Sequence, residues 1–285
     1  MKNKTATIWC ALAALSGSAA ADLVCLPEAF NPEQSREVSL TLGYATKYVE
    51  RGLALRDAET DSVFHGALSG GYALSPKSAL IGGVKVDFFA RKGFDHHDDS
   101  SPLCDEGTVL LQYAARASEN TVWALGYQFV HGGLPGYLHS ERHHGGRYIF
   151  NSQRPEEHSI VLDVHHDFTC LKGLFWDSRT QYSFRWEDGW YFSNTLGYEY
   201  ELSKCTSAVL EVTWTATCDY FEHHHLNSNG TQGWVFSFSL PMELTENAVL
   251  TPFVSCVLAG NGADAAGNFY RDSTAVFGAS LDFTF

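Results

Sequence analysis

The chain has 285 residues, of which 18% are charged and 14% aromatic. It is therefore poor in charge for a soluble domain, in which roughly 25% of residues are charged. Asp and Glu number 33 against 19 Lys and Arg, and the formal net charge of −14 disfavours nucleic-acid binding because phosphates would be repelled. The 45% hydrophobic content excludes a disordered chain. Beyond the N-terminal segment there is no apolar run of about 18 residues, which excludes a helical membrane protein.

The first 21 residues have the three parts of a secretory signal peptide. Met1-Lys2-Asn3-Lys4 is positively charged, residues 5–15 are apolar, and Ala19-Ala20-Ala21 supplies a small-residue cleavage site. We expect cleavage near Ala21, followed by a periplasmic lead-in over residues 22–36 and a folded domain over residues 37–285. An uncleaved anchor helix is the alternative, which the shortness of the apolar stretch disfavours.

Beyond the lead-in, apolar and polar residues alternate with a period of two. From Ala275 to Phe285 every second residue is Ala, Phe or Leu, and the residues between them are mostly small or polar. A helical pattern cannot produce such faces, whereas a strand with one apolar and one polar side does. Twelve such strands are predicted, at residues 37–50, 61–75, 78–92, 106–117, 120–131, 158–168, 174–186, 189–201, 206–217, 231–244, 247–258 and 272–285.

The connections between these strands alternate between tight turns and long loops, with Glu187-Asp188 as the one short exception. Together with the even strand count and the aromatic C-terminal residue, this is typical of a Gram-negative outer-membrane β-barrel. Lipid cannot satisfy exposed backbone groups, so membrane strands must close into a barrel. We predict an all-β, transmembrane, antiparallel up-and-down barrel of about 12 strands, with short periplasmic turns and long extracellular loops. A soluble β-sandwich is the alternative, but its outward faces would be polar.

One residue does not fit this scheme easily. Pro252 lies within the predicted strand 247–258, which is apolar on both faces. Proline donates no backbone hydrogen bond and is therefore disfavoured inside a closed sheet. The sequence alone offers no account of how it is accommodated.

If the aromatic faces contact lipid, the alternate residues face a lumen. Basic residues predominate on the first four strands and acidic ones on the sixth, eighth and ninth, which predicts a transverse field across a selective pore. The alternative is that the charges pair and fill the lumen, because twelve strands lie between the filled eight-stranded barrels and the 16–18-stranded channels. The predicted pore-lining residues are Lys47, Arg51, Lys85, Asp87, Arg116, Asp163, His165, Arg179, Arg185, Glu199 and Glu211.

Histidines are concentrated in three of the predicted external loops. Imidazole is a good ligand for Zn and Cu, and loops that meet above a barrel mouth could supply several ligands. No established metal-binding spacing is present, and the alternative is that these side chains are solvated surface residues. No other cofactor is expected. The candidate ligands are His96, His97, His143, His144, His223 and His225.

Six of the seven cysteines remain after removal of the signal peptide, in an oxidising compartment. Cys170 and Cys205 fall in two predicted turns on the same rim, so we expect a disulfide between them. The pairing of the other four cysteines stays open.

The first predicted hairpin carries a family resemblance. Residues 42–52 read Leu-Gly-Tyr-Ala-Thr-Lys-Tyr-Val-Glu-Arg-Gly. This segment resembles the Ser-Asp-Tyr-x-x-Arg-Gly opening of the TorF-like porins, although Gly43 and the extra residues between Tyr44 and Arg51 depart from it. The resemblance implies a porin-like outer-membrane barrel and does not indicate a substrate.

A second short resemblance raises the question of hydrolysis. Residues 226–230, Leu-Asn-Ser-Asn-Gly, resemble the His-x-Ser-Asn-Gly signature of outer-membrane phospholipase A, in which the histidine is the base. Leu226 stands at that position, and His225 is three residues from Ser228. Residues three apart on a strand lie on opposite faces, so the pair would not be aligned for nucleophilic activation. An enzyme is therefore not expected, and a lipid hydrolase is a remote alternative.

These observations predict a porin-like channel that passes small polar solutes or ions through a charged lumen. The alternative is a plugged barrel that acts as a surface receptor, adhesin or metal-binding protein through its His-rich loops. Outer-membrane lipid and small solutes or ions are the expected partners, and self-association into a homo-oligomer is left open.

Overall fold

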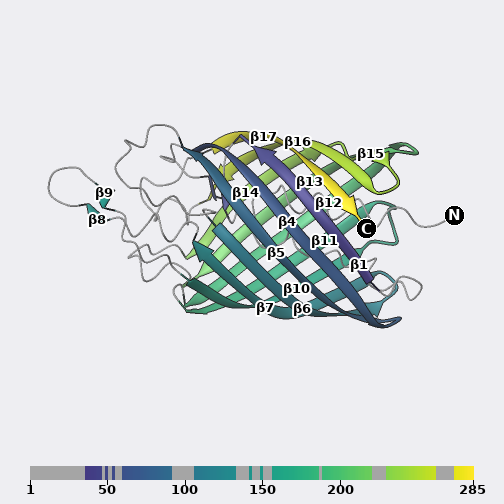
Figure 1. Ribbon diagram of the computed structural model, residues 1–285, viewed down its shortest axis with the longest axis horizontal. Helices are drawn as coiled ribbons and strands as arrows, with labels where there is room; N and C mark the ends of the chain where they lie inside the picture. The colour runs from purple at the N-terminus through teal and green to yellow at the C-terminus, as the bar shows by residue number, and fades with distance from the viewer. Residues whose placement is uncertain are drawn as a thin grey trace.

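A closed antiparallel β-barrel makes up most of the computed structural model (Figure 1). The structure describes residues 36–46, 49–50, 53–54, 60–91, 106–132, 141–142, 148–149, 156–185, 188–219, 229–260 and 273–285. Within these ranges every regular element is a strand. The same ranges contain no helix that is long and apolar enough to cross a membrane.

Thirteen strand segments form the barrel wall. They make up twelve strands, because β14 and β15 are two pieces of one strand. Each strand pairs with the next one along the chain, and β1 pairs with β17 to close the ring. The segments are β1 (Arg36–Ala45), β4 (Thr60–Ser75), β5 (Ser78–Arg91), β6 (Glu106–Ser118), β7 (Thr121–Gly132), β10 (Glu156–Asp167), β11 (Leu174–Arg185), β12 (Gly189–Ser203), β13 (Thr206–Cys218), β14 (Gly230–Ser239), β15 (Met242–Thr245), β16 (Ala248–Ala259) and β17 (Ser273–Thr284).

Two small hairpins are separate from the barrel sheet. One pairs β2 (Val49–Glu50) with β3 (Leu53–Ala54), and the other pairs β8 (Glu141–Arg142) with β9 (Tyr148–Ile149). The predicted fold is thus confirmed: an all-β, closed, twelve-stranded antiparallel barrel. The predicted signal peptide and lead-in fall on residues 1–35, outside the described part of the chain.

The two ends of the barrel differ. At one end the strands are joined by tight turns, such as Pro76-Lys77 and Glu119-Asn120, and the C-terminus lies at this same end (Figure 1). We call it the short-turn end, and we call the opposite end, where β8 and β9 lie, the long-loop end. Only the connection from β11 to β12 is short at the long-loop end, as the sequence predicted.

The two faces of the wall differ as the period of two requires. On β10, Ser159, Val161 and Asp163 are buried, whereas Ile160 and Leu162 between them are exposed. The same alternation continues around the ring, so large apolar side chains cover the outside. They include Leu42, Phe64, Leu68, Tyr72, Phe88, Leu111, Tyr127, Leu196, Leu210, Trp234, Phe236 and Phe277, each more than a third exposed. An exposed apolar surface this extensive needs an apolar neighbour.

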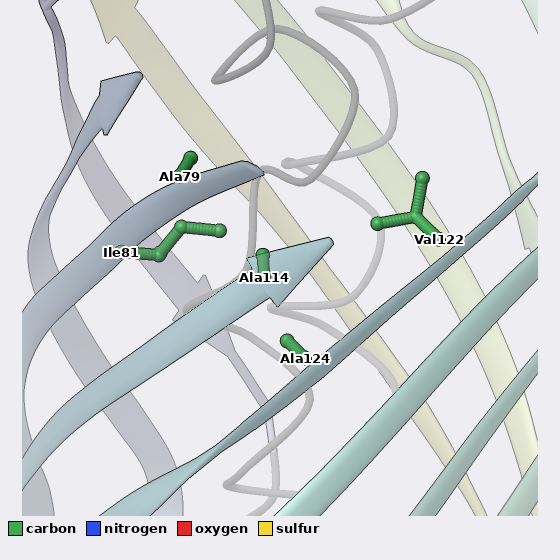
Figure 2. Close-up of a cluster of buried hydrophobic side chains, with 5 residues drawn as sticks. All are labelled: Ala79, Ile81, Ala114, Val122 and Ala124. Atoms are coloured by element: carbon green, nitrogen blue, oxygen red, sulfur yellow. The ribbon is translucent and has the colours of Figure 1, made fainter. Parts of the chain in front are cut away.

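Small apolar side chains cover the inner face of β5, β6 and β7 toward the short-turn end. Figure 2 shows Ala79 and Ile81 from β5, Ala114 from β6, and Val122 and Ala124 from β7. Ala79, Ala114 and Ala124 lie directly opposite one another across the three strands. The inward side chains here are short, so larger inward side chains from neighbouring strands can extend over this part of the wall.

The structure accommodates Pro252 at a break in the neighbouring strand. β14 ends at Ser239 and β15 begins at Met242, and in the gap Leu240 donates its N–H to the carbonyl of Pro252 over 3.0 Å. A strand residue directs its C=O and N–H to the same side. The missing N–H of Pro252 therefore faces the gap at Leu240 and Pro241, and the pairing of Pro252 with Ala279 on β17 is kept.

The predicted disulfide between Cys170 and Cys205 is wrong, because both residues are free and exposed. They lie in the turns of two successive hairpins, β10–β11 and β12–β13, so two strand spacings separate the turns. Two spacings amount to about 10 Å, which exceeds the Cα separation of about 4.4–6.8 Å that a disulfide needs. Cys218 and Cys256 are also free and exposed.

Candidate functional site

A buried ion pair lies on the inner wall between β10 and β11. Asp163 and Arg179 are direct cross-strand neighbours, and Arg179 donates two hydrogen bonds to the carboxylate, Nε to Oδ1 over 2.6 Å and Nη2 to Oδ2 over 2.8 Å. Arg179 is 2% exposed and Asp163 is 8% exposed. Two parallel hydrogen bonds of this kind fix the orientation of both groups.

A third residue reaches this pair from two strands away. Gln112 on β6 donates its Nε2–H to Oδ2 of Asp163 over 2.6 Å, across the intervening strand β7. It can do so because the inward residues of β7 at this level, Ala124 and Gly126, are the smallest available. A Cβ at residue 126 would lie 2.4 Å from Cγ of Gln112 and 2.1 Å from the carbonyl oxygen of Leu111. Gly126 thus provides the space that links β6 to β10.

The polar wall continues toward the long-loop end. Gln181 on β11 donates its Nε2–H to Oε1 of Glu157 over 2.5 Å and to Oγ of Ser159 over 3.0 Å. Ser159 donates its own hydroxyl to Glu157 over 2.9 Å. All three residues are at most 3% exposed. The inner face of β10 and β11 is therefore a continuous hydrogen-bonded surface.

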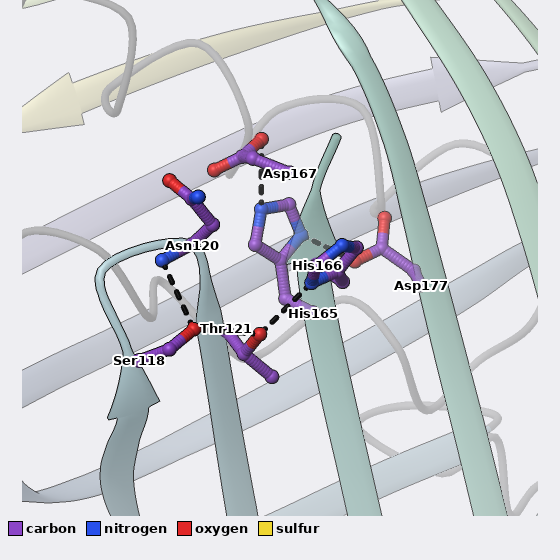
Figure 3. A network of polar contacts seen from close by, with 7 residues as sticks. All are labelled: Ser118, Asn120, Thr121, His165, His166, Asp167 and Asp177. Atoms are coloured by element: carbon purple, nitrogen blue, oxygen red, sulfur yellow. Dashed lines mark hydrogen bonds and ion pairs between the residues drawn. The ribbon is translucent and has the colours of Figure 1, made fainter. Parts of the chain in front are cut away.

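A second charged group lies on the same two strands near the short-turn end (Figure 3). His165 contacts Asp177, its cross-strand neighbour, through Nδ1 over 2.6 Å and Asp167 through Nε2 over 3.4 Å. Thr121 on β7 contacts Nδ1 of the adjacent His166 over 2.8 Å. Both rings are thus held in place by neighbouring side chains.

Large inward side chains lie flat over glycines in four cross-strand pairs. Phe175 faces Gly197, and a Cβ there would lie 1.9 Å from Cζ of the ring. The same relationship joins Phe253 to Gly278, His65 to Gly43, and Gln112 to Gly126. A ring that covers a glycine on the adjacent strand packs against the backbone instead of extending away from the wall. These four glycines therefore limit how far large side chains project inward.

The other inward charges are spread around the ring. Lys85 contacts Asp87 on the same strand over 3.2 Å. Asp282 on β17 accepts hydrogen bonds from Thr41 over 2.6 Å and from Ser280 over 3.0 Å. Among the described residues, the buried carboxylates are Asp87, Glu106, Glu157, Asp163, Glu199, Glu211 and Asp282, and the buried Lys and Arg residues are Lys85 and Arg179.

Several residues predicted to line a lumen do lie on the inner face. Lys85, Asp87, Asp163, His165, Arg179, Glu199 and Glu211 are buried there. Arg116 is half-buried opposite the inward Val122. Arg185 ends β11, and only its backbone is described. Lys47 and Arg51 fall outside the described residues. In the described part of β5 and β6, each strand carries one inward base, Lys85 or Arg116, and one inward carboxylate, Asp87 or Glu106. The predicted predominance of basic residues is therefore not seen on these two strands.

Sequence reasoning missed inward residues that the structure brings into this wall. Glu106 lies at the first position of β6, which is also the first residue of the predicted strand, and Glu157 lies at the second position of β10, one residue before the strand predicted from residue 158. Gln112, Gln128 and Gln181 are uncharged and so were not considered. The period of two would have identified all five, because each has the parity of an inward residue.

The remaining predicted sites lie largely outside the described residues. His96, His97, His143, His144, His223 and His225 all fall there, as does Ser228 of the hydrolase-like motif. The described residues contain no group of three or more His, Cys, Asp or Glu side chains arranged to hold a metal ion.

Solved structures with a similar backbone include outer-membrane channels and porins. An outer-membrane channel from Pseudomonas putida F1 has a TM-score of 0.51 and 12% identity over 90% of this chain and 99% of that chain. The NanC porin has a TM-score of 0.48 and 11% identity over 86% and 98% of the two chains. The KdgM porin has a TM-score of 0.47 and 11% identity over 87% and 99%. The likeness to the Pseudomonas channel shows the barrel fold. No protein-family model matches the chain, and no curated protein matches it.

Proposed function

We propose that this protein is a porin-like channel of the bacterial outer membrane, which passes small polar solutes or ions. The observation that carries the proposal is the contrast between the two faces of the closed wall. Large apolar side chains cover the outside, whereas carboxylates, glutamines, serines and threonines line the inside. Membrane-spanning barrels have this arrangement, with lipid on one face and a polar interior on the other.

Other features agree with this proposal. A signal peptide over residues 1–21 would export the chain, and short turns with the C-terminus would then lie at the periplasmic side. The resemblance of residues 42–52 to the TorF-like porins and the likeness to an outer-membrane channel point in the same direction. Outer-membrane lipid surrounds the barrel in this proposal, and self-association is compatible with it.

The test is single-channel recording in a planar bilayer with the refolded protein, with and without micromolar zinc. Discrete current steps are the expected result. Block by zinc would in addition connect the loop histidines with the mouth of the pore. A folded barrel that gives no current would overturn the channel proposal.

One observation favours a second candidate. The inward side chains are buried, many of them at less than 3% exposure, as in a barrel whose interior is filled. The protein would then be a surface receptor, adhesin or metal-binding protein that works through its external loops. In that case, shortening the two long loops at 132–157 and 218–230 between their flanking strand ends, within residues 133–155 and 219–229, abolishes partner or metal binding and leaves the barrel folded, whereas a channel keeps its conductance after the same change.

A further inference from the structure

Three polar side chains interrupt the apolar outer face of the barrel. Ser178 and Thr180 lie on β11, and Asn194 lies on β12. They point outward, because the side chains next to them along the strands, such as Arg179 and Ser193, are buried on the inner face. Ser178 and Asn194 are direct cross-strand neighbours, so the three groups lie together. We call them the polar patch.

No second patch of this kind occurs in the part of the wall that the structure describes. Beyond the three residues at each strand end, the other outward side chains are aromatic or belong to Ala, Gly, Val, Ile, Leu, Pro and Cys. Asn194 lies four residues from Trp190 toward the long-loop end and four residues from Tyr198 toward the short-turn end. Trp and Tyr favour the two membrane surfaces, so Asn194 lies between these levels, in the hydrocarbon layer.

The polar patch has no hydrogen-bonding partner in the described part of the barrel. None of its three side chains forms a hydrogen bond there, although Ser178 lies opposite Asn194. Trp214, the other cross-strand neighbour of Asn194, donates its indole N–H to the hydroxyl of Thr231 over 3.2 Å instead. A polar group that faces hydrocarbon is costly unless it is hydrogen-bonded. The patch therefore calls for a partner outside the barrel.

From the polar patch we infer that the protein forms a two-fold symmetric dimer in the membrane, with β11 and β12 of one copy against β11 and β12 of the other. An amide has both donors and an acceptor, so Asn194 can pair with the same residue of a second copy. Hydrogen bonds between polar side chains hold membrane-spanning segments together in lipid.

Symmetry selects a dimer over a ring of three or more copies. A two-fold axis along the membrane normal brings patch against patch at the same depth. In a ring each copy would instead place its patch against a different face of its neighbour, and the described strands offer only apolar side chains there. The inference requires a barrel in a bilayer and does not depend on whether the lumen conducts.

The experiment counts copies by single-molecule photobleaching of barrels that carry one dye each, in phosphatidylcholine vesicles at increasing protein-to-lipid ratios. The wild-type protein should reach two bleaching steps and not three. The double variant Ser178→Ala/Asn194→Leu should raise the dissociation constant roughly tenfold or more. Leu68→Ala, on β4 across the ring and 53% exposed in the wild type, is the control and should leave the constant unchanged.

Folding is checked separately by heat-modifiable migration in a denaturing gel. The double variant should fold as well as the wild type, because it places apolar groups against lipid. A second test identifies the face: with the native cysteines replaced by serine, Ser178→Cys should form a disulfide between two copies on oxidation, whereas Leu68→Cys should not.

The outcomes separate this inference from the proposed function. A barrel that stays monomeric at every ratio would overturn the dimer and assign the patch to a lipid or to another membrane protein. A trimer, or a dimer that the double variant does not weaken, would overturn it equally. A folded dimer that passes no current would support the dimer and overturn the channel alone.

Discussion

Arg179 holds Asp163 through two hydrogen bonds on the inner wall, and both residues are almost fully buried. Arg179→Met leaves the carboxylate buried without its counter-charge, so we expect a loss of about 3–5 kcal/mol in the free energy of unfolding. Urea unfolding of the reconstituted protein measures it. Lys172→Met breaks the exposed pair with Glu201 and should cost no more than about 1 kcal/mol. Equal losses in the two variants would contradict a special role for the buried pair.

Gly126 provides the space that lets Gln112 reach Asp163 across β7. Gly126→Ala places a methyl group against Gln112 and the backbone of Leu111, and we expect it to destabilise the barrel by about 1–3 kcal/mol. Gly82→Ala is the matched control, because its Cβ would lie 3.6 Å from the nearest atom, an ordinary contact. The same urea titration compares them, and a Gly126→Ala barrel as stable as wild type would show that the space is not needed.

Gly197 lets the ring of Phe175 lie against the wall. Gly197→Ala must displace the ring, and in a conducting barrel we expect the single-channel conductance to fall because the ring then projects into the lumen. Adding Phe175→Ala to this variant should restore the conductance. If the double variant conducts no better than Gly197→Ala alone, the displaced ring is not the obstruction.

The exposed apolar surface tests the membrane location. Leu196 lies at the middle of β12 and is 51% exposed, whereas Leu202 lies near the short turn and is 55% exposed. In a bilayer, Leu196→Arg should cost about 2–4 kcal/mol and Leu202→Arg about 0–1 kcal/mol, since the cost depends on depth. Refolding into lipid vesicles at increasing urea measures both. A soluble barrel would tolerate the two changes equally.

The free thiols of Cys170 and Cys205 lead to a chemical prediction. Both are exposed in turns, so both should react with a maleimide in the folded protein without any reductant. Mass spectrometry of the labelled peptides detects the modification. A peptide that joins residues 170 and 205 through a disulfide would contradict the structure and support the expectation from the sequence.

The alternation of residues along each strand was enough to predict the barrel and its twelve strands, because the inward and outward faces meet such different surroundings. The individual contacts were not predictable. Gln112 and Asp163 are 51 residues apart, and their contact depends on the register of three strands and on a glycine in the middle one. The disulfide prediction failed for a related reason. Two turns on the same rim can be too far apart for a disulfide, because the number of strand spacings between them sets their separation.

The proline-associated break between β14 and β15 has a consequence for how the barrel sits in a bilayer. At Leu240 and Pro241 the ladder toward β16 lacks the hydrogen bond that Pro252 cannot donate. Water or headgroups can compensate for a missing bond of this kind, but hydrocarbon cannot. The break should therefore lie at the level of the lipid headgroups, and it would serve as a depth marker that fixes how far the short-turn end rises above the membrane surface.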